Sequence, residues 1–187
     1  MSDKRSDILE ATLTLISDNG FHGTPMSQIA KEADVGAGTI YRYFDSKEAL
    51  INELFLELKR DFSQVMLAGF SEDDPPEVQF RNVWLNIVNY CIQHPKEMLF
   101  IEQYHNSPFL TPETEVETMQ YLAPIYTYFQ SAIEAGLMKA LPFDMLTAFT
   151  YDVAVALAKR HISGALVLDD ANLELAVQAC WDALKAY

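Results

Sequence analysis

The sequence of 187 residues is poor in cysteine and positive charge and has no long apolar run, and each shortage excludes a class of protein. Its two cysteines, Cys91 and Cys180, form no CxxC motif, which favours buried thiols in a reducing compartment over a disulfide framework or a cysteine-rich metal site. No stretch of about 18 apolar residues occurs, so the sequence predicts no membrane span. The segment Ser2-Asp3-Lys4-Arg5 lacks the apolar core of a signal peptide. We therefore expect a cytoplasmic protein.

The distribution of charge bears on whether the chain can bind nucleic acid. Thirteen Lys and Arg against 27 Asp and Glu give a net charge of −14, which at first sight argues against such a partner. Residues 1–60 hold seven basic and ten acidic residues, a net of −3, whereas residues 61–187 hold six and seventeen, a net of −11. Within residues 36–47, Arg42 and Lys47 outnumber Asp45. A local face near residue 40 can therefore meet phosphates, although we expect modest non-specific binding and a need for dimeric contact.

Apolar residues recur at helical spacing along the whole chain, and no strand pattern or internal repeat is present. The sequence therefore predicts an all-α protein, with a kink possible in the seventh helix at Pro124. The predicted helices cover residues 4–19, 26–33, 37–44, 45–67, 77–93, 96–105, 113–135, 143–167 and 171–185.

Local signals place the ends of the first helices. Gly20 is expected just after the first helix, and Thr24 is expected to cap the second helix with Pro25 at its first position. Asp34 lies in the next turn, where a short polar side chain tolerates a left-handed backbone. Lys47 opens the fourth helix after a cap at Asp45 or Ser46, although a cation at a helix N-terminus is unfavourable by about 0.3–1 kcal/mol. A phosphate bound at that N-terminus would explain the lysine.

The second and third helices, with a turn of three or four residues between them, match a helix-turn-helix. The first fifty residues contain the elements Ile8…Ala11…Leu15, Gly20-Phe21, Thr24-Pro25-Met26, Ile29-Ala30, Ala33-Asp34-Val35, Gly38-Thr39-Ile40-Tyr41-Arg42-Tyr43-Phe44 and Ser46-Lys47-Glu48-Ala49-Leu50. In these elements the chain resembles the TetR/AcrR family of transcriptional regulators, and Gly38–Met66 has a fainter resemblance to its RamR-like multidrug-sensing type. The resemblance implies a three-helix DNA-binding domain over residues 1–46 and a helical ligand-binding and dimerisation domain over residues 47–187.

The resemblance also implies roles for eight DNA-contacting residues. Phosphate contacts are expected from Thr24, Thr39, Tyr41, Tyr43 and Lys47, and contacts to base edges from Ser27, Ala37 and Arg42. Gly36 stands where the family often has a serine cap, and Ala37 and Gly38 have no hydrogen-bonding side chains. Arg42 is therefore the best candidate for reading a base, with DNA shape supplying much of the remaining specificity.

Three alternatives for these residues stay open at this stage. The tyrosines could belong to the core, Arg42 could pair with Asp45 or lie in solvent, and Lys47 could be an ordinary surface lysine.

The C-terminal two-thirds of the chain is rich in aromatic residues, which at helical spacing belong to the core more often than to a pocket. The family resemblance nevertheless implies an effector cavity there, and aromatic rings beside excess carboxylates suit a small hydrophobic or cationic ligand. The candidate lining residues are Trp84, Tyr90, Tyr104, Met119, Tyr126 and Phe149.

The last two predicted helices carry many small and branched residues, which suit close helix packing. The resemblance implies that they form a homodimer, which would present two recognition helices to a palindromic operator on double-stranded DNA. The resulting hypothesis is a ligand-responsive repressor that needs no cofactor.

Two features of the sequence point to rival functions. Glu102-Gln103-Tyr104-His105 matches one Glu-x-x-His unit of a di-iron carboxylate bundle, but no second unit occurs. No P-loop, HExxH or GxSxG motif is present, so we expect no catalytic residues, no metal ligands and no enzyme. A helical small-molecule-binding protein without DNA binding is the other alternative, supported by the net charge of −3 on the first sixty residues.

Overall fold

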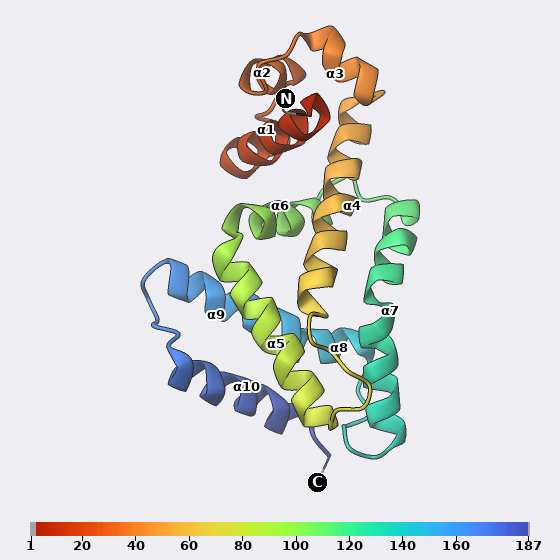
Figure 1. Cartoon of the computed structure of the whole chain (residues 1–187), viewed down its shortest axis with the longest axis vertical. Helices are drawn as coiled ribbons and strands as arrows, with labels where there is room; N and C mark the ends of the chain where they lie inside the picture. The colour runs from red at the N-terminus through yellow and green to blue at the C-terminus, as the bar shows by residue number, and fades with distance from the viewer. Residues whose placement is uncertain (1–2, 187) are drawn as a thin grey trace. The chain divides into compact units, whose positions relative to one another are not determined.

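A computed structural model describes residues 3–186 and confirms the all-α fold. Within that range the only pairing of extended backbone is an isolated antiparallel bridge between Met138 and Lys185. The elements, shown in Figure 1, are α1 (Lys4–Asn19), α2 (Met26–Glu32), α3 (Ala37–Tyr43), α4 (Lys47–Met66), α5 (Pro76–Gln93), α6 (Pro95–His105), α7 (Pro112–Glu134), α8 (Phe143–Thr147), a π-helical turn η1 (Ala148–Asp152), α9 (Val153–Ile162) and α10 (Asp170–Leu184).

The backbone contacts divide the chain into two compact units. The first contains the described residues up to Arg60 together with Pro95–Met119, and the second contains Asp61–His94 and the described residues from Gln120 onward. Helices α4 and α7 each contribute residues to both units. The sequence-based boundary after Ser46 divides the chain by role, not by contacts, and stays a prediction.

The first unit is built on apolar side chains from α1, α2 and α3, the red and orange helices of Figure 1. Ile8 and Ile16 of α1, Ile29 of α2 and Ile40 of α3 are all completely buried. Residues eight positions apart lie close to the same side of a helix, so α1 presents a single apolar face to the two shorter helices. This burial fixes which side of α3 is left for solvent.

The predictions for Gly20, Asp34 and Ser46, which rest on neighbouring residues alone, are confirmed. Gly20 follows α1 with a φ of 72°, and Asp34 has a φ of 50° in the turn between α2 and α3. Both values lie in the left-handed region, which glycine occupies readily and which aspartate tolerates. Ser46 caps α4, since its Oγ accepts a hydrogen bond of 3.1 Å from the backbone N–H of Ala49.

A cluster of aromatic rings joins the turn after α1 to α6 within the first unit. The ring of Phe21 lies 5.7 Å from that of Phe100 and 5.2 Å from that of Phe109. Tyr104 of α6 stacks on Phe55 of α4 with ring centroids 3.8 Å apart and planes 10° apart. We call these five residues the ring cluster. Edge-on and stacked rings contribute beyond the area they bury, so the cluster holds α6 against α4 and the α1–α2 turn.

The second unit is centred on α5, which packs against α9 and α10 (Figure 1). Trp84 of α5 is 1% exposed, and Ala154 and Ala158 of α9 are equally buried. The small side chains of α9 allow its backbone to approach α5 closely. Phe80 of α5 contacts Trp181 of α10 with ring centroids 5.5 Å apart.

The largest error in the predicted elements concerns residues 143–167. The single expected helix contains the π-helical turn η1, and α9 ends at Ile162, five residues before the predicted end at Val167. Gly164 has a φ of 75°, which an α-helix does not accommodate, so the helix stops there. Pro124, by contrast, lies inside α7 and the helix continues through it.

Candidate nucleic-acid interface

The helix-turn-helix is held by buried apolar groups and by hydrogen bonds in its turn. The N–H of Val35 donates to the carbonyl oxygen of Ala30 at 2.9 Å, and Phe44, just after α3, is 2% exposed. Gly36 precedes α3 without a side-chain cap, as expected from the sequence, and its carbonyl oxygen accepts a hydrogen bond of 2.8 Å from the N–H of Thr39. The backbone alone therefore starts this helix, and its first residues carry no bulky side chain.

The solvent side of α3 carries most of the residues predicted to contact DNA. Ala37, Tyr41, Arg42 and Tyr43 are exposed, and Ser27 is exposed on α2. Thr39, the sixth predicted residue on this part of the chain, is half-buried. Tyr41 is 54% exposed and Tyr43 is 37% exposed, so neither is the core aromatic of the alternative interpretation.

Arg42 lies at the surface beside Tyr43, with its guanidinium carbon 5.8 Å from the centre of that ring. Within residues 3–186 it forms no ion pair with Asp45, and none of its guanidinium N–H groups donates a hydrogen bond. A guanidinium presents a planar fork of donors that can bind the O6 and N7 atoms of guanine together. The five N–H donors of Arg42 are therefore available to a partner.

Lys47 is half-buried, and its placement differs from that of an ordinary surface lysine. Its Nζ donates to the carbonyl oxygen of Phe21 at 2.5 Å, which links the start of α4 to the turn after α1. Burial lowers the pKa of Lys47, and the charge of Glu48 partly offsets this. An ammonium group has three donors, so one bond to a carbonyl leaves two for a phosphate. The phosphate contact from Lys47 stays a prediction, with a tethering role added to it.

Thr24 requires a correction. Its side chain is completely buried, and its hydroxyl donates to the carbonyl oxygen of Gly20 at 2.9 Å or to that of Leu15 at 3.1 Å. It does not cap α2, whose first flanking residue is Pro25 and which has no side-chain cap. The hydroxyl hydrogen is thus used by a carbonyl group at the end of α1 and is not available to a phosphate. We therefore remove the Thr24 side chain from the expected DNA contacts.

Arg5 is a positioning residue that sequence reasoning missed. It forms ion pairs with Glu53 and Glu57 of α4, and its guanidinium lies 5.8 Å from the ring of Phe44. Hydrogen bonds to Glu53 and then Glu57 raise the pKa of Arg5. The two glutamates are four residues apart on one helix face, a spacing that indicates a shared cation. Arg5, Glu53 and Glu57 thus form a clamp that fixes α1 against α4 and, through Phe44, against the end of α3.

Four acidic residues of the first unit gather around one hollow. Asp7, Glu10, Glu32 and Asp34 line a hollow of about 340 Å³ between α1 and α2. None of the exposed α3 residues lines this hollow. The net charge of −3 over residues 1–60 is therefore compatible with a phosphate-binding face on α3.

The six predicted ligand-binding residues are divided between the two units, and their role in binding an effector stays a prediction. Trp84 and Tyr90 are buried in α5, whereas Tyr126 and Phe149 are 50% and 41% exposed. Met119, in the first unit, is 52% exposed. None of the six lines the cavities described here.

Tyr104, the sixth, is a packed residue of the first unit. Its ring is completely buried against Phe55, and its hydroxyl donates to Asn52 Oδ1 at 2.9 Å or to the carbonyl oxygen of Phe109 at 3.0 Å. Burial raises the pKa of Tyr104, so the hydroxyl stays neutral and serves as a donor.

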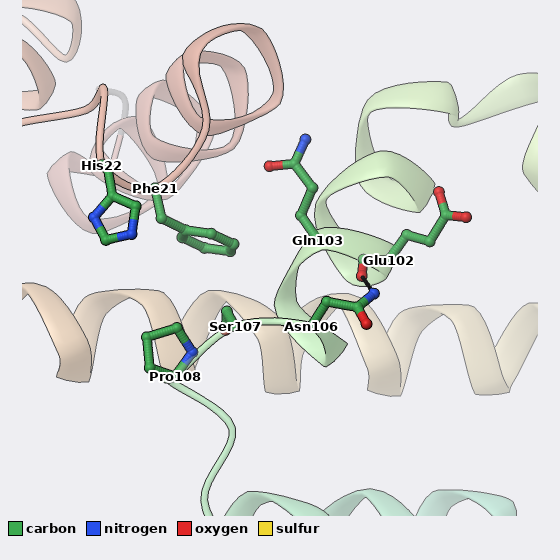
Figure 2. Close-up of a pocket in the computed structure, with 7 residues that line it drawn as sticks. All are labelled: Phe21, His22, Glu102, Gln103, Asn106, Ser107 and Pro108. Carbon is green, nitrogen blue, oxygen red and sulfur yellow. Dashed lines mark hydrogen bonds between the residues drawn. The ribbon is translucent and has the colours of Figure 1, made fainter.

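A cavity of about 430 Å³ lies beside the ring cluster (Figure 2). Figure 2 shows the ring of Phe21 pointing from the turn after α1 toward α6, with His22, Glu102, Gln103 and Asn106 around the cavity. The Nδ2 of Asn106 donates to the carbonyl oxygen of Glu102 at 3.0 Å. Its lining combines one carboxylate with a histidine, two amides and apolar groups, and this mixture specifies no ligand class.

Glu102 and His105 do not extend to a di-iron constellation. Among residues 3–186, no three His, Cys, Asp or Glu side chains are arranged to hold a metal ion. None of the helices in the described range is long and apolar enough to cross a membrane.

Comparisons with known proteins cover nearly the whole chain. Residues 75–185 match the family model "Tetracyclin repressor-like, C-terminal domain", and residues 8–54 match "Bacterial regulatory proteins, tetR family". The chain is 27% identical over 185 residues to an uncharacterized HTH-type transcriptional regulator of Haemophilus influenzae, which covers 98% of this chain and 97% of that protein.

Two solved structures have the same fold over almost their full length. A TetR family transcription regulator from Marinobacter aquaeolei VT8 is 27% identical with a TM-score of 0.94, covering 98% of this chain and 96% of the other. A TetR family protein described as a transcriptional regulator from Vibrio parahaemolyticus is 34% identical with a TM-score of 0.88, covering 99% and 100%.

Proposed function

This chain belongs to the TetR family of bacterial transcriptional regulators, and we propose that it is a homodimeric repressor released from a palindromic operator by a small hydrophobic or cationic effector. It is a DNA-binding regulator and not an enzyme. The observation that carries the proposal is the exposed face of α3, where two tyrosines and Arg42 are presented to solvent on a helix anchored by Ile40. Large aromatic side chains exposed beside an uncommitted guanidinium suit a nucleic-acid partner. We place this function in the cytoplasm.

In the proposed complex, α3 lies in the major groove of each half-site. Arg42 reads a base, most simply a guanine, while Ser27 and Ala37 lie near base edges. Thr39, Tyr41 and Tyr43 donate their hydroxyl groups to phosphates on either side. Lys47 adds a charge at the N-terminus of α4, where backbone N–H groups also favour an anion.

The proposed dimer forms through the last two predicted helices, now α8–η1–α9 and α10. Apolar side chains are exposed along this part of the second unit, including Ile162 at 49%, Val167 at 64% and Leu175 at 70%. Exposed apolar residues that gather on adjacent elements favour an interface. A two-fold dimer of this kind uses the same surface on both subunits and gives a palindromic DNA site.

Effector release is proposed to act through α4. Residues of this helix belong to both units, so a displacement of its C-terminal part on ligand binding reaches Lys47 and the Phe21 carbonyl. The coupling is reciprocal, because operator DNA must weaken effector binding by the same factor by which effector weakens operator binding.

The proposal is tested by selecting bound fragments from the source genome and measuring binding to the selected duplex by gel shift and fluorescence anisotropy. We expect a palindromic site and a protein dimer by analytical ultracentrifugation. Lys96→Ala is the control for variants that remove Arg42 or Lys47, because it also removes one cation. Lys96 is exposed on α6 of the first unit and lies outside α3. A monomeric protein that binds no duplex at low ionic strength would contradict the proposal.

A further inference from the structure

The second unit contains a cavity that none of the predicted effector residues lines. It has a volume of about 410 Å³, within the range typical of small-molecule sites. Its walls come from the segment between α4 and α5, the first turn of α5, and the C-terminal part of α7 with the turn that follows. The lining includes Phe70, Glu72, Asp74, Gln79, Tyr128 and Leu137.

The aromatic wall of the cavity is fixed in place. The hydroxyl of Tyr128 donates to the carbonyl oxygen of Pro76 at 2.8 Å, which ties α7 to the start of α5. The ring of Phe70 meets that of Tyr128 edge-on, with centroids 6.0 Å apart and planes at 85°. Two rings held in this way offer a preformed aromatic surface to a ligand.

The polar side of the cavity is equally ordered. Gln79 is 7% exposed, and its Nε2 donates to the carbonyl oxygens of Glu72 and Asp74 at 3.2 and 2.7 Å. These bonds hold the loop against α5. They use both amide hydrogens, whereas Gln79 Oε1 accepts no hydrogen bond from any residue between 3 and 186. A buried glutamine thus brings an unused acceptor to the cavity lining.

The charge around this acceptor has one sign. Glu72 and Asp74 line the cavity, no Lys, Arg or His does, and neither carboxylate forms an ion pair in the described part of the chain. An anionic ligand is repelled here, and a neutral apolar ligand would desolvate two carboxylates without compensation. A ligand that is cationic, donates N–H hydrogen bonds and carries an apolar group satisfies every part of the lining.

We propose that this cavity binds a small organic ammonium ion, whose N–H groups reach Gln79 Oε1 and the carboxylates while its hydrocarbon part covers Phe70 and Tyr128. The site goes beyond the proposed function, because its occupancy needs neither DNA nor the predicted effector residues. A failure of DNA binding therefore leaves this inference intact, and the reverse also holds.

The test uses the full-length protein without DNA and phenethylammonium as the probe, titrated by calorimetry at neutral pH. The neutral analogue 2-phenylethanol has a similar shape without the charge. We expect saturable binding of phenethylammonium and roughly tenfold weaker binding of the alcohol. Equal affinity for the two, or no saturation with millimolar phenethylammonium, overturns the proposal.

Variants of the loop separate this site from the general attraction of an acidic protein for cations. Glu72→Gln and Asp74→Asn should each weaken binding roughly threefold, and the double variant roughly tenfold. Asp73→Asn is the matched control, because Asp73 is exposed in the same loop but does not line the cavity. A loss of affinity in Asp73→Asn equal to that in Asp74→Asn overturns the proposal. Ser131→Phe, which fills the cavity from α7, should abolish binding, and thermal melting of each variant confirms that it is folded.

Discussion

Two regions of the first unit combine aromatic rings with a cation, and they differ in what surrounds them. On the outer side of α3, Tyr41 and Tyr43 are exposed and Arg42 lies at the surface. In the interior, Phe55 stacks on Tyr104, and Lys59 on the same helix as Phe55 is only 6% exposed. The same types of side chain are therefore buried in one place and available to a partner in the other. Residue type alone does not distinguish the two; burial does.

The sharpest test of this difference compares Phe55→Ala with Tyr41→Ala. Removing the fully buried ring of Phe55 should lower the free energy of unfolding by about 3–5 kcal/mol, because the stacked partner is lost and a cavity is left. Tyr41→Ala should change it by no more than about 0.5 kcal/mol while weakening DNA binding. Urea unfolding followed by circular dichroism measures both values, and equal destabilisation by the two substitutions would remove the distinction.

The buried cation predicts an unusual pH dependence. Burial lowers the pKa of Lys59 to about 8 from an ordinary value of 10.5. Because the unfolded chain then binds more protons between these pH values, this group makes the folded protein more stable as pH rises from about 8 toward 10.5. Its effect on the free energy of unfolding is at most about 3 kcal/mol.

Lys59→Met is the matched variant, since it keeps the length of the side chain and removes the charge. It should be more stable than the native protein at pH 7, and the difference should shrink as pH approaches 10. A difference between the two proteins that is constant from pH 7 to 10 would show that Lys59 does not titrate in this range.

Arg42 provides the test of the exposed cation. Arg42→Ala should reduce discrimination at one operator position by about 1–3 kcal/mol, because the planar donor fork is lost, with little change in unfolding. Anisotropy titrations with a set of single-base operator variants measure this discrimination. Arg42→Lys keeps the charge without the fork and should recover non-specific affinity only. Undiminished discrimination by Arg42→Ala would exclude the base-reading role.

Lys47 combines a predicted phosphate contact with a hydrogen bond inside the first unit, so its removal should have a modest effect on both DNA binding and stability. Lys47→Ala is expected to weaken binding to all DNA sequences alike and to lower the salt slope by roughly one. The lost bond to the Phe21 carbonyl should reduce the free energy of unfolding by about 1 kcal/mol. Operator binding that is normal at moderate salt would leave Lys47 with its tethering role alone.

The parts of the fold that sequence reasoning predicted are those that depend on neighbouring residues. The bounds of α1, the left-handed Asp34 and the cap at Ser46 follow from short-range geometry. The predicted helix cap at Thr24 was wrong because a threonine before a helix has two kinds of hydrogen-bond partner. Its hydroxyl can cap the helix that follows, or it can donate to carbonyl groups of the helix before it, as Thr24 does. Local propensity does not distinguish these two arrangements.

In the candidate site, too, the features that depend on local spacing were predictable and the contacts between distant residues were not. The exposed residues of α3 follow from the helix-turn-helix spacing, since burial of Ile40 determines which side chains face outward. The link between Lys47 and Phe21 and the clamp around Arg5 join residues 26 to 52 positions apart, which no local pattern specifies. The six aromatic and methionine candidates for the effector site were chosen by composition, and composition does not determine which face of a helix meets a neighbour.

The π-helical turn Ala148–Asp152 has a consequence for comparing this chain with its relatives. A turn of this kind takes in one more residue than an α-helix does, so side chains after Val153 are rotated by about 100° from where an uninterrupted helix would point them. A relative without the extra residue would present a different set of side chains at the same alignment column. Interface residues on α9 are therefore better matched by counting from Val153 than from the start of α8.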